Sequence, residues 1–191
     1  DPDSPVYMLG GFSVISSVYK DRERLTERFR SGAGFGWHEH HADLFVGTEQ
    51  FFRPGYRAHL VAEWLPALEG VEERLRAGGK LADIGCGHGI STILLAQAFP
   101  EATAYGFDYH DASIERAKQI AEAEGVAQNT EFAVASAKDY PGEDYDLVCF
   151  FDCLHDMGDP VAAARNVRRR LAEDGAWMLV EPRAGDRVED N

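Results

Sequence analysis

A short apolar stretch that leads through a glycine-rich turn into a second apolar run is the feature that most constrains this chain. Residues 81–99 read L-A-D-I-G-C-G-H-G followed by I-S-T-I-L-L-A-Q-A-F. This order predicts a buried strand, a tight turn and a helix. Glycine suits the turn because it readily adopts positive φ angles and because a Cβ would hold a ligand away from the backbone amides. We therefore expect a cofactor cradle in which Asp83, Gly85, Cys86 and Gly87 contact the ligand.

The spacing of the glycines distinguishes between two classes of cofactor. Dinucleotide-binding turns have the pattern G-x-G-x-x-G, which places a pyrophosphate on the helix N-terminus. Counting from Gly85, the third glycine is Gly89, and Ile90 stands where the dinucleotide pattern needs glycine. The pattern D-x-G-x-G-x-G instead resembles the first motif of class I S-adenosylmethionine-dependent methyltransferases, in which this loop holds the methionine and ribose parts of the cofactor. A tight turn without a ligand is the alternative.

From residue 80 onward, apolar strands alternate with helical segments. Nearly continuous apolar strands that alternate with helices are typical of a parallel sheet covered on both faces. We therefore expect a doubly wound, mainly parallel, Rossmann-like α/β fold. The helix expected at residues 161–172 should begin at Asp159 and bury Val161, Ala164, Val167 and Leu171. Strands are expected at residues 80–84, 103–107, 130–135, 146–151 and 176–181, and helices at residues 112–124, after an N-cap at Asp111, and 161–172.

The ends of the strands carry the expected cofactor contacts, because ligands of such sheets bind beyond the carboxyl ends of the strands. Asp108 ends the second strand about twenty residues after the glycine turn, where a carboxylate can accept hydrogen bonds from both ribose hydroxyls of an adenosine. Tyr109 can lie against the adenine face. In the methyltransferases that the chain resembles, the segment after the third strand contacts the adenine edge, which implies this role for Ser136 and Ala137.

The fourth strand continues as F-F-D-C-L-H-D-M, which resembles the fourth motif of small-molecule methyltransferases. That resemblance implies that the strand end at Phe151 faces the methionine amino group. The segment lacks the N/D-P-P-Y/F motif of enzymes that methylate nucleic acid bases. We interpret His155 as a candidate general base for a hydroxyl nucleophile. Alternatively, its imidazole is hydrogen-bonded to the following loop and has only a structural role.

Residues 1–79 lack the strand–helix alternation and are expected to form a helical lid over a core of residues 80–191. Trp37, His38 and Tyr56 are expected to line the substrate side of this lid, with His38 as a second choice of base. The stretch W-H-E-H-H-A-D invites a metal hypothesis, but no further His or Cys cluster has a recognisable ligand spacing, so no metal is expected. Arg53 is a candidate partner for the methionine carboxylate or an acidic substrate. Helices are expected at residues 8–19, 21–30 and 57–69, the last with Leu60 and Leu65 in its apolar stripe.

Composition limits the partners. The formal net charge of −14 disfavours phosphate backbones and anionic membranes, so neither nucleic acid nor a membrane is expected as a partner. The three cysteines form no C-x-x-C pair, which is typical of reduced thiols in a cytoplasmic protein. No signal peptide is visible, and no apolar run approaches the ~20 residues of a membrane span. A homodimer is left open.

The resemblance also predicts what this chain lacks. Class I methyltransferase folds continue past the fifth strand into a helix and an antiparallel hairpin, whereas this chain stops at Asn191 and lacks an initiator methionine. We therefore expect the C-terminal strands to be missing and the chain to be a fragment. The segment Gly10–Tyr56 resembles that of actinobacterial small-molecule methyltransferases with an N-terminal winged-helix domain, which is absent here.

The expected function is transfer of a methyl group from S-adenosylmethionine to a small-molecule acceptor by in-line attack on the sulfonium methyl. Two alternatives remain. The first is a non-catalytic module in which bound S-adenosylmethionine has a regulatory role. The second is a nicotinamide-dependent oxidoreductase, which Ile90 disfavours.

Overall fold

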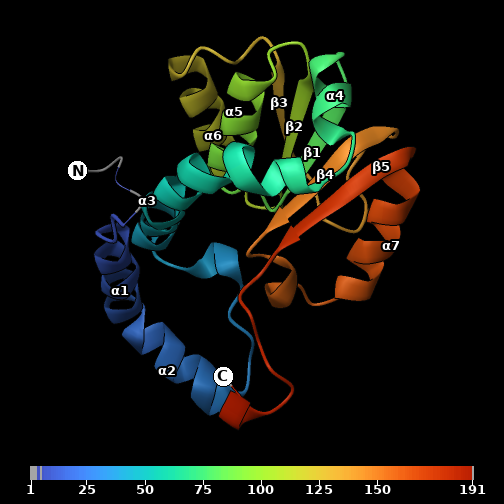
Figure 1. The fold of residues 1–191 in the computed structure, drawn as a ribbon. Coiled ribbons are helices and arrows are strands. Elements are labelled where there is room, and N and C mark those ends of the chain that lie inside the picture. The colour runs from blue at the N-terminus through green and yellow to red at the C-terminus, as the bar shows by residue number, and fades with distance from the viewer. Residues whose placement is uncertain (1–3, 5, 191) are drawn as a thin grey trace.

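A single five-stranded sheet forms the centre of the structure, a computed structural model that describes residue 4 and residues 6–190. All strand pairs are parallel, in the order β3-β2-β1-β4-β5 (Figure 1). The order reverses between β1 and β4, and in such sheets ligands bind in the crevice at this switch point. The expected doubly wound fold is confirmed. The strands are β1 (Lys80–Ile84), β2 (Thr103–Asp108), β3 (Thr130–Val134), β4 (Tyr145–Phe151) and β5 (Leu171–Val180).

Helices cover both faces of the sheet, and alternate residues of the strands pack against them. Leu147 and Cys149 of β4 belong to the core on the side of α4 (Val71–Arg76), α5 (Ile90–Ala98) and α6 (Asp111–Ala123). Val148 and Phe150 belong to the core on the side of α7 (Pro160–Arg170) (Figure 1). This alternation explains why the strands read as continuous apolar runs in the sequence.

The boundary between α7 and β5 differs from the prediction. The helix ends at Arg170 and the strand already begins at Leu171, with a register irregularity opposite Tyr145. The expected buried face is confirmed at Val167, which is 1% exposed, but was wrong at Val161, which is 57% exposed, and Asn166 is fully buried. The Asn166 side chain donates a hydrogen bond to the Ala137 carbonyl at 3.3 Å. A pattern of apolar residues cannot predict that a polar residue such as Asn166 lies on the buried face of the helix.

The N-terminal region is helical, as expected, but its longest helix was not predicted. It contains α1 (Gly10–Lys20), α2 (Arg22–Ser31) and α3 (Ala42–His59), and α1 and α2 extend away from the sheet (Figure 1). Pro54 and Gly47 make residues 42–59 a poor helix on propensity alone. A Cβ on Gly47 would lie 2.7 Å from the Val14 backbone nitrogen, so the backbones of α1 and α3 are in direct contact there. Tertiary packing therefore stabilises α3.

The helix expected at residues 57–69 is not continuous. A π-helical turn at Leu60–Trp64 and a 3₁₀ turn at Leu65–Ala67 follow α3, where Pro66 lacks the N–H of a regular helix. Leu60 and Leu65 are fully buried, as the apolar stripe indicated. In the part of the chain that the structure describes, no helix combines the length and the apolar character needed to cross a membrane.

The turn between β1 and α5 is held by a buried carboxylate. One oxygen of Asp83 accepts hydrogen bonds from the hydroxyls of Ser91 at 2.6 Å and Thr92 at 2.7 Å, both in the first turn of α5. Gly89, at the N-cap of this helix, offers no side chain for capping. The Asp83 carboxylate therefore contributes the acceptor and the negative charge that a helix N-terminus favours. Gly85 has a φ of 72° and Gly87 a φ of 53°, values that favour glycine.

Replacement of Asp83 by asparagine should change how stability depends on pH. Burial raises the pKa of Asp83 to about 6 from an ordinary value of 3.8, so the folded protein binds a proton that the unfolded chain releases at lower pH. The unfolding free energy of the wild type therefore decreases as the pH rises through this window. From pH 4 to pH 7, the difference in unfolding free energy, D83N minus wild type, should increase by roughly 2–3 kcal/mol. Urea denaturation across this range measures it, and two parallel curves would contradict the assignment.

Candidate active site

A cavity of about 1060 Å³ lies at the carboxyl ends of the strands and is covered by α3. The core contributes the glycine turn, the ends of β2 and β4 and the loop after β3, and the N-terminal region contributes aromatic side chains. Most of the residues predicted to bind the cofactor or substrate meet in this one cavity. Its lining includes Gly85, Cys86, Gly87, Asp108, Tyr109, Ser136, Ala137, Phe151, His155, Trp37 and Tyr56.

Asp83 and His38 are the two predicted site residues that do not line the cavity. Asp83 lies behind the glycine turn and binds the hydroxyls at the start of α5, so its role is to hold the turn. His38 lies outside, where its backbone N–H donates a hydrogen bond to the Tyr109 hydroxyl at 3.3 Å. Its ring also meets the Tyr109 ring edge-on, with 5.6 Å between centroids. Tyr109 thus joins the core to the 3₁₀ helix at Trp37–Glu39.

Asp108 has the geometry expected of a ribose ligand. Its two carboxylate oxygens accept one backbone N–H each, from Gly87 and from His110, both at 2.9 Å. A carboxylate oxygen accepts more than one hydrogen bond, so both oxygens retain capacity for a hydroxyl donor from the cavity. The same side chain therefore fixes the glycine turn and presents acceptors to a ligand.

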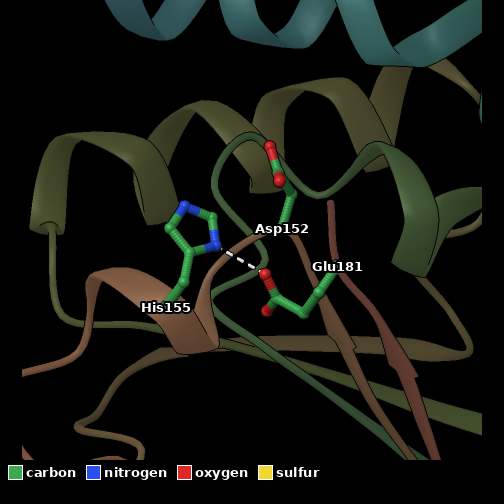
Figure 2. A group of neighbouring side chains, drawn as sticks. All are labelled: Asp152, His155 and Glu181. Carbon is green, nitrogen blue, oxygen red and sulfur yellow. Dashed lines mark hydrogen bonds and ion pairs between the residues drawn. The ribbon is translucent and has the colours of Figure 1, made fainter. Parts of the chain in front are cut away.

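His155 forms a dyad with a residue that the sequence analysis did not single out. Figure 2 shows the His155 ring at the end of β4, with its Nδ1 2.5 Å from an oxygen of Glu181 after β5. The other Glu181 oxygen accepts the backbone N–H groups of Cys153 at 3.2 Å and Leu154 at 2.8 Å. The signal in the sequence was an acid at the end of the expected fifth strand, just as Asp108 ends the second.

The dyad shifts both ionisation equilibria. The hydrogen bond to Glu181 raises the pKa of His155 above 6.5. Burial acts to raise the pKa of Glu181, but the hydrogen bonds from His155 and from the two backbone amides outweigh it, so this pKa is lowered. Glu181 therefore stays ionised and favours the tautomer of His155 that carries a proton on Nδ1. The Nε2 atom, which lies 3.5 Å from a carboxylate oxygen of Asp156, is then the ring nitrogen that can accept a proton.

Asp152 joins this dyad in a group whose ligand atoms all lie within 4.8 Å of one another (Figure 2). Such a spacing is compatible with a metal ion, but the direct His155–Glu181 hydrogen bond gives the group a role without one. The histidines of the W-H-E-H-H-A-D stretch have other partners. His40 pairs with Asp21 at 3.3 Å, and the His41 side chain accepts the Asp43 N–H at the start of α3.

A buried ion pair joins α3 to the glycine turn. Nδ1 of His88 lies 2.8 Å from a carboxylate oxygen of Glu49, with both side chains about one-tenth exposed. Burial acts to raise the pKa of Glu49, but the hydrogen bond and charge of His88 outweigh this effect and lower it. Arg53 was expected to bind a ligand carboxylate, and the structure pairs it instead with Glu49 at 4.0 Å and Glu124 at 3.6 Å.

Comparison with known proteins gives the family. The model of the methyltransferase domain family matches residues 75–190, which is more than half of the chain. The chain belongs to this methyltransferase family. Together with the five-stranded sheet and the glycine turn, the match identifies a class I S-adenosylmethionine-dependent methyltransferase domain. S-adenosylmethionine is accordingly its cofactor.

Two curated relatives indicate the range of the family. Tocopherol O-methyltransferase from Arabidopsis thaliana is 28% identical over 179 residues, or 87% of this chain and 48% of that protein. The 27-O-demethylrifamycin SV methyltransferase from Amycolatopsis mediterranei is 34% identical over 107 residues, or 55% of this chain and 39% of that protein. The methyltransferase domain thus spans less than half the length of these two relatives.

A solved structure extends the likeness to the N-terminal helices. A candidate O-methyltransferase from Nostoc punctiforme PCC 73102 is 26% identical and superimposes with a TM-score of 0.61. The superposition covers 91% of this chain and 52% of that protein. Because so much of the chain is covered, the fold of the N-terminal region is shared as well as that of the sheet.

The residues present fit S-adenosylmethionine. A Cβ built on Gly87 would meet no atom within 4 Å, so the turn leaves open space beside its backbone, in the cavity, where a ligand can approach. Gly85 is packed on its other side, since a Cβ there would lie 2.9 Å from Cys153 Sγ. Asp108 presents its carboxylate to the cavity, and the loop after β3 contributes Ser136 and Ala137 to the lining.

Replacement of Asp108 by alanine should weaken cofactor binding. The hydrogen bonds of a carboxylate contribute about 1.5–3 kcal/mol, which corresponds to a tenfold to hundredfold higher Kd for S-adenosylhomocysteine. Isothermal titration calorimetry measures this Kd. Asp111→Ala is the matched control, because Asp111 is exposed in the next helix and does not line the cavity. Unchanged affinity in D108A, with its circular dichroism spectrum intact, would remove the ribose assignment.

Replacement of Glu49 by glutamine tests the link between the lid and the glycine turn. The variant keeps the size of the side chain but removes the charge that faces His88, so the turn should be held less firmly. We expect the Kd for S-adenosylhomocysteine to rise about threefold to tenfold, equivalent to ~0.7–1.4 kcal/mol. Glu63→Gln is the control, because the Glu63–His59 pair is exposed and outside the cavity. Equal affinities for the two variants would contradict a role of the ion pair in cofactor binding.

Proposed function

We propose that this protein transfers the methyl group of S-adenosylmethionine to a hydroxyl oxygen of a small-molecule acceptor. The observation that carries the proposal is the His155–Glu181 dyad, which stands at the cavity beside the end of β4. A hydroxyl group is a weak nucleophile until it loses its proton, and an imidazole whose Nδ1 proton is held by a carboxylate is suited to accept that proton at Nε2. The names of the two curated relatives support a small-molecule acceptor, and those names and that of the Nostoc protein support transfer to oxygen.

Each part of the site has a role in the proposed reaction. When bound, S-adenosylmethionine supplies an electrophilic methyl group on a sulfonium. The glycine turn and Asp108 orient the donor, and α3 covers the cavity and excludes water. His155 accepts the acceptor's hydroxyl proton at Nε2, while Glu181 holds the Nδ1 proton and stabilises the imidazolium that forms. The rest of the rate enhancement comes from positioning.

The pH dependence of the reaction tests the dyad. Below its pKa, His155 is protonated and cannot act as a base. In the wild type, kcat should therefore decrease as the pH is lowered through the His155 pKa, and this acid limb of the pH profile should lie above pH 6.5. Glu181→Gln removes the interaction that raises this pKa, and the limb should therefore move to lower pH. His155→Ala should lower kcat by about 10²- to 10⁴-fold while the Kd for S-adenosylhomocysteine stays within about twofold.

The measurement is release of S-adenosylhomocysteine with the best substrate from a panel of phenols, alcohols, amines, thiols and carboxylic acids. His59→Ala is the control, because His59 lies outside the cavity. A limb at the same pH in wild type and E181Q would remove Glu181 from the mechanism. Binding of S-adenosylhomocysteine without transfer to any member of the panel would favour the non-catalytic alternative, and binding of NADH in preference to it would favour the oxidoreductase.

Removal of metal ions tests whether Asp152, His155 and Glu181 bind a metal ion or whether His155 and Glu181 act as a hydrogen-bonded dyad. Because the dyad works through a direct hydrogen bond, we expect EDTA to leave the rate unchanged. A loss of activity in EDTA that Mg²⁺ restores would instead assign these side chains to a metal ion that binds the acceptor.

A further inference from the structure

The cavity is larger than its cofactor requires. Its volume of about 1060 Å³ is at the upper end of the range of about 300–1,000 Å³ found for pockets that hold one drug-sized ligand. Residues of the glycine turn, β2 and the loop after β3 account for one part of the wall, where the adenosine and methionine groups bind. The remaining space is bounded by α3, the end of β4 and the dyad. On the proposed function, this second part holds the methyl acceptor.

Aromatic side chains form the wall of this second part. Phe52 and Tyr56 of α3 stack at 5.8 Å with an interplanar angle of 15°, and Tyr56 lies 5.3 Å from Phe151 at the end of β4. Phe52 and Tyr56 keep exposed surface in the cavity, unlike Tyr145 and Phe150, which are buried in the core. Exposed aromatic surface in a concave site gains free energy when an apolar ligand covers it. A planar ring can extend the existing stack.

The charged side chains in the wall of this second part are mainly negative, whereas a carboxylate acceptor needs a positive partner. Of the carboxylates that line the cavity, Glu49 is paired with His88 and Asp108 lies on the adenosine side, which leaves Asp152, Asp156 and Asp159 near the end of β4. The lining side chains from the described residues include no arginine and only one lysine, Lys138. Lys138 follows Ser136 and Ala137 on the adenosine side. Arg53, the cation nearest in α3, is paired with Glu49 and Glu124. An anionic group beside the dyad would therefore lose its hydration without gaining a positive partner.

We propose that the methyl acceptor is a planar aromatic or conjugated compound whose reacting group is an uncharged hydroxyl, and that acceptors carrying a carboxylate at this position are rejected by charge. The ring binds between α3 and β4, against Phe52, Tyr56 and Phe151. The hydroxyl faces Nε2 of His155. This inference rests on the proposed function and adds the chemical class of the acceptor to it.

Three matched probes test the proposal, each titrated into the protein saturated with S-adenosylhomocysteine: 2-naphthol, 2-naphthoate and 2-decahydronaphthol. The Kd of 2-naphthol should be at least about tenfold lower than that of 2-naphthoate, a difference of ~1.4 kcal/mol. It should also be roughly threefold or more below that of 2-decahydronaphthol, which has the same skeleton without the aromatic face. Asp156→Lys should reduce the first ratio several-fold, whereas Asp174→Lys, at the opposite end of β5, should not change it.

The outcomes separate this inference from the proposed function. If 2-naphthoate binds as tightly as 2-naphthol, or if the saturated alcohol does, the acceptor class is overturned. Failure of all three probes to bind to a protein that does bind S-adenosylhomocysteine also overturns the acceptor class but leaves methyl transfer standing. Failure to bind S-adenosylhomocysteine itself overturns the proposed function. A selectivity that is equal in D156K and wild type removes the charge explanation.

Discussion

The hydrogen bonds from Ser91 and Thr92 to the Asp83 carboxylate are the contacts on which the site depends. They tie the end of β1 to the first turn of α5 and so fix the glycine turn that runs between them. Asp108 then binds the turn from the other side through the Gly87 amide. Two acids of neighbouring strands thus have different tasks, because one is sealed beneath the turn and the other faces the cavity. Both side chains are buried, and their position relative to the cavity, rather than residue type, separates their roles.

Much of the fold could be predicted because it follows from local patterns. Ile114, Ala117 and Ala121 repeat at helical spacing and are all buried in α6, and the strands are apolar because both faces of the sheet are covered. The helix α3 could not be found in this way, because Gly47 and Pro54 oppose helix formation locally. Its stability comes from contact with α1, which no local pattern encodes. Fold prediction thus succeeded where local preference and tertiary packing agree.

The same division applies to the site. Asp108 and His155 could be found because Asp108 ends β2 and His155 follows β4, at the edge of the sheet where ligands bind. Glu181 carried the same signal but was passed over. The Glu49–His88 pair had no signal of this kind, since the two residues are 39 positions apart and meet only because α3 crosses the glycine turn. His38 was predicted from its neighbours in the sequence, and the turn of the chain at Trp37–Glu39 directs it away from the cavity.

The seam between Gly10 and Gly47 has a consequence for how such a domain can diversify. A methyl group on either glycine would collide with the backbone of the facing helix, so the seam tolerates almost no variation. One helical turn further along, Phe52 lies on the wall of the cavity. Substitutions in the lining can therefore change which acceptors fit the cavity while α3 stays in the same position. A fixed contact between α1 and α3 beside a changeable lining thus separates the position of α3 from the choice of acceptor.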